Sequence, residues 1–175
     1  MTGTPTQTST PQIPCIAGSE DYPYKLVIIG GGPSGCSVLV RAARIGYLDN
    51  LCGPDVTESI AGVCIIDKGP RNKFGGGKLQ DYAINSNTFA NKFASNVLED
   101  KPDSLPPESC QGSLLEKLKH CDYCKQVEAY GAKQGSLQVI GGFLREVGST
   151  VLRMVSAYKP SSACMTRTNV QWIQR

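Results

Sequence analysis

The sequence predicts an α/β fold, a parallel sheet whose strands are joined by helical crossovers. Two short apolar runs rich in β-branched residues, at 25–29 and 63–66, are typical of buried strands, and 164–173 alternates like a third. Between them, apolar residues recur at helical spacing. Strands that alternate with helices favour parallel pairing, because the chain must cross back over the sheet between strands.

The composition is that of a folded domain without a strong charge bias. The chain has 175 residues, of which 40% are hydrophobic and 19% are charged, and its net charge is only +3. It contains no basic block, and no apolar run approaches the ~20 residues of a spanning helix. We therefore expect neither a nucleic acid nor a membrane as a partner.

The first 23 residues differ from the remainder of the chain. Residues 1–23 are rich in Thr, Pro and Ser and have neither arginine nor an apolar stretch, so we expect a disordered arm and no targeting signal. The eight cysteines would suit a disulfide scaffold only in a short secreted chain. We expect free thiols in a reducing, cytoplasmic location.

Residues 24–175 are expected to form one domain, beginning with a strand at 25–29 that runs into a helix at 34–45. A surface connection is predicted for 47–61, before the second strand. Further helices are predicted from Asn87 or Thr88 to about 98, over 113–130 and over 142–158.

The turn after the first strand has the pattern G-x-G-x-x-G. Gly30 permits a sharp turn, Gly32 lets the backbone approach a pyrophosphate, and Gly35 lets the helix pack on the strand. Pro33 and Ser34 begin the helix, whose free N–H groups and positive dipole end favour phosphate. The pattern predicts a dinucleotide site, with a ligand-free structural turn as the alternative.

A carboxylate closes the second predicted strand. Asp67 could accept hydrogen bonds from both hydroxyls of a ribose, as the acidic residue of such sites does. It lies 32 residues beyond Gly35, where ~20 is usual. The long connection predicted for 47–61 accounts for the extra length.

Three segments together resemble the FAD-binding half of the glutathione-reductase-like flavoprotein superfamily: residues 26–35, 65–71 and the glycines at 75–77. The resemblance implies a Rossmann-like domain that binds FAD, although the family more often has Glu where this chain has Asp67. It places Asp67 on the adenosine ribose and a basic residue near the adenine. The candidate cofactor contacts that follow from it are Lys68, Arg71, Gly76, Gly77 and, through its backbone, Val170. For Lys68 a solvated loop charge is the simpler interpretation.

Residues 82–88 look like a segment of flavin-containing and N-hydroxylating monooxygenases in which an Asn-Thr pair lies beside the flavin ring. The resemblance makes Asn87 the candidate catalytic residue, because its amide could hydrogen-bond an oxygenated flavin. The alternative is that Asn87 and Thr88 cap the next helix.

Two features of that superfamily are missing from the sequence. There is no second glycine motif for NAD(P)H, the possible reductant, and no Gly-Asp pair near the C-terminus. We therefore expect an incomplete FAD/NAD(P)-binding domain, the N-terminal portion of an FAD-dependent oxidoreductase. The alternatives are a non-catalytic remnant that still binds dinucleotide and an NAD-binding dehydrogenase domain.

Cys121 and Cys124 form a C-x-x-C pattern beside His120, the single histidine. No further Cys pair or histidine has the spacing of a tetrahedral zinc site. Because the pair falls within the helix predicted for 113–130, it lacks the helix N-terminus that activates a redox thiol. We expect no metal and no redox couple here, and the absence of a G-x-S-x-G turn argues against a hydrolase.

Overall fold

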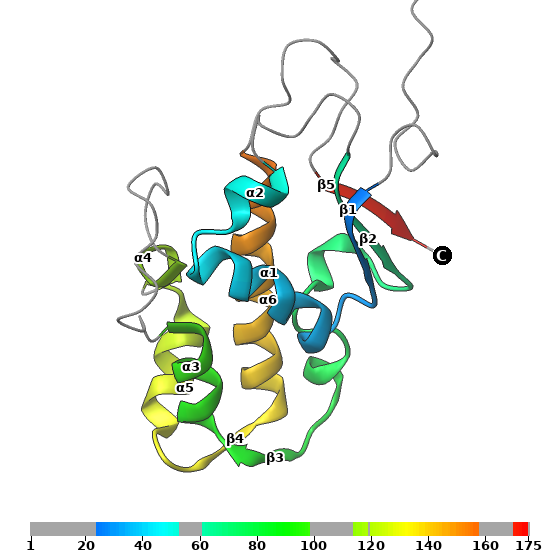
Figure 1. Ribbon diagram of the computed structural model, residues 1–175. Helices are drawn as coiled ribbons and strands as arrows, with labels where there is room; N and C mark the ends of the chain where they lie inside the picture. The colour runs from blue at the N-terminus through cyan, green and yellow to red at the C-terminus, as the bar shows by residue number, and fades with distance from the viewer. Residues whose placement is uncertain (1–23, 53–60, 99–113, 119, 158–169, 175) are drawn as a thin grey trace, which may run out of the picture.

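The computed structural model describes residues 24–52, 61–98, 114–118, 120–157 and 170–174. Figure 1 shows a sheet on one side of a long central helix, α6 (Leu137–Ser156), and a group of shorter helices on its other side. The arm predicted for 1–23 lies outside the described residues.

The predicted α/β fold with a parallel sheet and helical crossovers is confirmed. The sheet has the order β1-β2-β5, formed by β1 (Tyr24–Ile29), β2 (Ala61–Asp67) and β5 (Val170–Gln174). Both pairs are parallel, with Ile28 opposite Ile65 and Ile65 opposite Trp172. Two helices, α1 (Pro33–Arg44) and α2 (Leu48–Cys52), connect β1 to β2. This arrangement is that of a partial Rossmann-like domain.

The helices beyond the sheet pack around α6. They are α3 (Ala90–Leu98), α4 (Leu114–Leu118) and α5 (Asp122–Tyr130), and all three contact α6, as α1 does. Two short 3-10 helices, η1 (Arg71–Lys73) and η2 (Leu79–Asp81), precede β3 (Asn85–Phe89), which pairs antiparallel with β4 (Gln134–Ser136). Figure 1 places β3 and β4 at the lower end of the molecule, apart from the parallel sheet.

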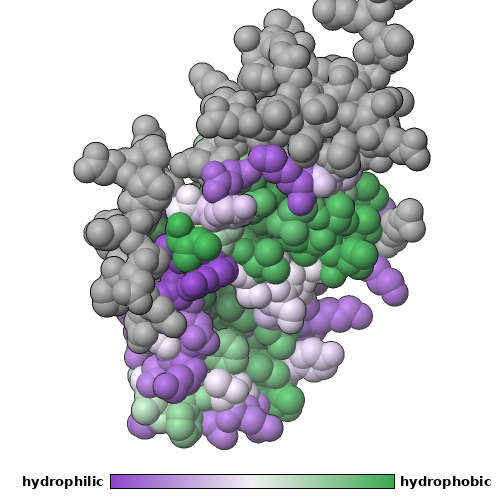
Figure 2. Space-filling model, viewed as in Figure 1, coloured by the Kyte–Doolittle hydropathy of each residue, from purple (hydrophilic) through white to green (hydrophobic). Residues whose placement is uncertain are grey.

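The core surrounds α6 and includes buried residues of the sheet and of the helices packed against α6. The helix buries the apolar stripe that the sequence predicts at helical spacing, with the members Phe143, Leu144, Val147, Val151, Leu152 and Val155. Within the described part of the chain, one face of β1 is covered and the other is open: Ile28 is 5% exposed whereas Ile29 is 82% exposed. Figure 2 shows hydrophobic surface over the region of β1 and α1.

Glycines let the chain after β2 lie directly on the backbone of α6. A Cβ on Gly148 would lie 2.2 Å from the Phe74 carbonyl oxygen, and one on Gly76 would lie 2.4 Å from the Gly141 carbonyl oxygen. Real Cβ atoms do not approach backbone so closely. The segment 74–77 is therefore held against α6 by contacts that exclude any larger residue.

The helix predicted from Asn87 or Thr88 begins later, at Ala90, because residues 85–89 form β3. Neither Asn87 nor Thr88 is its cap. Instead the N–H groups of Ala90 and Asn91 donate to the carbonyls of Lys133 (2.9 Å) and Gly131 (3.0 Å). The free N–H groups of its first turn thus find their hydrogen-bond acceptors in a distant segment of chain, which local sequence does not reveal.

Other predicted boundaries also change. The single helix predicted for 113–130 is wrong, since α4 and α5 are separate helices. The helix predicted for 142–158 is α6, which starts at Leu137 where Ser136 accepts a hydrogen bond from the Gln138 N–H. The connection predicted for 47–61 contains α2, and its residues 53–60 lie outside the described part. Of the strand predicted for 164–173, residues 164–169 also lie outside it.

Candidate functional site

The glycine-rich turn joins β1 to α1 and is fixed to the neighbouring strand. Gly30 has a φ of 93°, a conformation that favours glycine, and its N–H donates to the Ile66 carbonyl (2.8 Å). The turn therefore leaves β1 at the carboxyl edge of the sheet, where β2 also ends. In open parallel sheets this edge is the usual place for a ligand.

Gly35 and Gly32 have different surroundings. A Cβ on Gly35 would lie 2.0 Å from the Gly30 carbonyl oxygen and 2.9 Å from Ile28 Cγ2, so only glycine lets α1 pack on β1. A Cβ on Gly32 would meet nothing within 4 Å. Gly32 is the N-cap of α1, and no side chain of the described residues caps this end of the helix, where Pro33 and Ser34 are exposed. The open side of Gly32 is where an anion can approach the first turn of α1.

Asp67 lies beside this turn despite its unusual distance in the sequence. It is the last residue of β2, and its Oδ2 would lie 2.8 Å from a Cβ on Gly31 and 3.1 Å from one on Gly69. The side chain is half-buried. The fold thus brings together the turn and the carboxylate that the sequence predicts as one site.

Two residues of this site were missed by sequence reasoning, Gly31 and Trp172. A Cβ on Gly31 would also lie 3.0 Å from Trp172 Cη2, so the middle glycine is needed for both neighbours to approach. The three successive glycines were the available signal for Gly31. No local signal marks Trp172, because its position depends on the pairing of β5 with β2.

The second glycine segment lies next to the first. The Gly75 N–H donates to the Gly31 carbonyl (2.7 Å), and a Cβ on Gly77 would lie 3.4 Å from Gly32 Cα. Gly77 therefore lies beside the turn, where a cofactor contact was predicted. Gly76 faces α6 and has a packing reason to be glycine, whatever it binds.

The remaining predicted contacts are spread more widely. Lys68 is exposed, and its carbonyl accepts a hydrogen bond from Gln174 Nε2 (3.4 Å). The exposed Arg71 donates from Nη2 to Ser156 Oγ (3.1 Å), near the end of α6. Val170 begins β5 and pairs with Val63. Asn87 is exposed on β3, in the separate antiparallel sheet.

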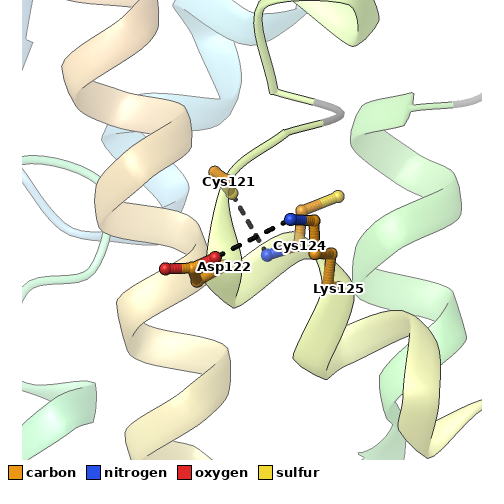
Figure 3. A network of polar contacts seen from close by, with 4 residues as sticks. All are labelled: Cys121, Asp122, Cys124 and Lys125. Carbon is orange, nitrogen blue, oxygen red and sulfur yellow. Dashed lines mark hydrogen bonds and ion pairs between the residues drawn. The ribbon is translucent and has the colours of Figure 1, made fainter.

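The C-x-x-C pattern is positioned differently from the prediction. Cys121 is the N-cap of α5, so the pair lies at a helix N-terminus and not within a helix. Figure 3 shows the Cys124 N–H donating to Cys121 Sγ (3.1 Å), beside an exposed ion pair between Lys125 and Asp122 (3.8 Å). The reason given from the sequence against a redox couple is therefore wrong.

The environment of the two thiols nevertheless disfavours thiolate. Burial raises the pKa of Cys121, and burial together with the nearby Glu128 raises the pKa of Cys124 to about 11. An activated redox thiol has a lowered pKa. Within the described ranges, no three potential metal ligands cluster together, and no helix has the length and apolarity to cross a bilayer.

Comparison with known proteins gives one distant similarity. The chain is 27% identical over 141 residues to CMP-5'-(3-aminopropyl)phosphonate hydroxylase of Streptomyces rubellomurinus (strain ATCC 31215). The match covers 81% of this chain but only 28% of the length of that protein. No protein-family model matches the chain, and no solved structure gives a significant match.

We predict that Cys124 is protonated at neutral pH and reacts only through its small thiolate fraction. Its pKa is raised to about 11, so its thiolate fraction rises about tenfold per pH unit below that value. The rate of alkylation by iodoacetamide should therefore increase about tenfold per pH unit between about pH 8 and about pH 10. Mass spectrometry of the labelled peptide measures this rate, with glutathione as the reference thiol. A rate that is already constant near neutral pH would show an activated thiolate and contradict the prediction.

Proposed function

We propose that this chain is the FAD-binding part of an FAD-dependent oxidoreductase with monooxygenase-like chemistry. The observation that carries the proposal is the placement of Asp67 against the glycine-rich turn at the carboxyl edge of the sheet. A phosphate-binding helix terminus and a ribose-binding carboxylate, side by side, suit a dinucleotide.

The turn fits a pyrophosphate. Gly32 has open space on its Cβ side, and the N-terminus of the 12-residue helix α1 has no side-chain cap. The N–H groups of the first turn and the positive end of the helix dipole are then available to an anion. Pro33 does not disturb this arrangement, because the N–H that it lacks would have no partner within the helix.

Asp67 fits the ribose of the adenosine half. Its carboxylate ends β2 and lies over Gly31, so a nucleotide whose phosphates sit at α1 would bring its sugar to this side. Two carboxylate oxygens can accept from two vicinal hydroxyls. The same geometry would serve NAD, so the choice of FAD rests on the resemblance and on the similarity to a hydroxylase.

The flavin would supply the redox chemistry when bound, and the chain would supply position and electrostatics. We propose NAD(P)H as the reductant and Asn87 as a residue that contacts the flavin ring. Because the chain spans about 28% of the length of the hydroxylase, the substrate and the full reaction are not assigned to it. An NAD-binding domain remains the second candidate, and tightly bound flavin distinguishes the two.

We predict that Asp67→Ala weakens FAD binding and leaves the fold intact. The lost hydrogen bonds to a charged acceptor should cost about 1 to 3 kcal/mol. Titration followed by flavin fluorescence gives the affinity, and circular dichroism checks the fold. The control is Asp81→Ala, which removes an exposed carboxylate of η2 whose Oδ1 lies 3.9 Å from Lys73 Nζ. Equal FAD affinity in the two variants would remove Asp67 from the site.

We predict that Gly32→Val abolishes FAD binding without unfolding the chain. Its side chain would enter space that is open in the structure and that we assign to the pyrophosphate. Gly35→Val is the matched contrast: its Cβ would clash with the Gly30 carbonyl, so this variant should lose thermal stability as well. Native FAD affinity in a folded Gly32→Val protein would contradict the proposal.

A further inference from the structure

Trp172 lies at the point where β5, the glycine-rich turn and Asp67 meet. It pairs with Ile65 at the centre of the sheet, and its Cη2 and Asp67 Oδ2 both lie within 3.0 Å of the Cβ position of Gly31. The indole and the carboxylate are therefore neighbours on the same side of the turn. Trp172 as a whole is half-buried.

Among the residues that the structure describes, an aromatic packing contact orients this ring. Phe74 meets it edge-on, with centroids 5.9 Å apart and planes at 89°. Among the described residues, the buried Nε1–H of Trp172 has no hydrogen-bond partner. A buried indole N–H usually has a hydrogen-bond acceptor, so this orientation is unusual.

We propose that Trp172 is the aromatic wall of the adenosine end of the site and packs against the purine base. This inference rests on the proposed function, which places a ribose at Asp67. The base attached to that ribose is the nearest aromatic part of the ligand. Trp172 is the aromatic ring beside it, because both Trp172 and Asp67 lie against Gly31. Stacking between bases and aromatic side chains is a common source of nucleotide affinity.

The proposal can be tested in the native chain, because Trp172 is its single tryptophan. ADP is the probe, since it carries the adenosine half and does not absorb light in the emission band of indole. FAD does absorb there, and it would quench tryptophan by energy transfer even from a distance. Inorganic pyrophosphate is the matched control ligand, because it can occupy the turn but cannot reach the ring.

ADP should change the intensity or the wavelength of Trp172 emission along a saturating curve that matches its affinity from calorimetry. Pyrophosphate should bind with little change in emission. If ADP binds by calorimetry and leaves the emission as it was, the inference is wrong while the proposed function stands. If neither FAD nor ADP binds the folded chain, both fail.

A pair of variants gives a second, independent test of this inference. Trp172→Leu removes the aromatic face and should weaken ADP binding about tenfold, or about 1.4 kcal/mol. Trp172→Phe keeps a ring and should stay within about threefold of native affinity. Pyrophosphate affinity should be unchanged in both variants. This measurement is the control for damage to the turn, because such damage would lower the affinity for pyrophosphate. Native ADP affinity in Trp172→Leu would overturn the inference.

Discussion

The contact between Gly35 and the Gly30 carbonyl is the constraint on which the rest of the site depends. A Cβ at Gly35 would lie 2.0 Å from that oxygen, so the first turn of α1 rests directly on the end of β1. This close approach directs the N-terminus of α1 toward the carboxyl edge of the sheet. The hydrogen bond from Gly30 to Ile66 then fixes the same turn to β2, which ends in Asp67.

A second set of close backbone contacts connects this turn to the helical half of the molecule. The Gly75 N–H donates to the Gly31 carbonyl, while Gly76 and Gly148 let the same segment lie on α6. The turn is therefore supported by the sheet on one side and by the 20-residue α6 on the other. Such support is what a site needs in order to hold a ligand without reorganising.

The parts of this architecture that were predictable are those that depend on local sequence. The strand–turn–helix unit is predicted by an apolar run followed by glycines, and the stripe of α6 by its 3.6-residue period. Features that depend on distant contacts were not predicted: Lys133 and Gly131 satisfy the start of α3, and β5 brings Trp172 to the turn. Cys121 was placed within a helix because Leu114, Leu118 and Val127 continue one apolar periodicity across the break between α4 and α5.

NMR of the isotopically labelled chain, titrated with FAD, tests whether the turn and Asp67 form one dinucleotide site. We predict that the backbone amides of Gly31, Gly32, Ser34, Gly35 and Asp67 shift together, with a single saturating affinity. Amides at Asp122 and Cys124, on the far side of α6, should keep their positions. Saturable FAD binding that leaves the turn amides unshifted, or no binding by the folded chain, would contradict it.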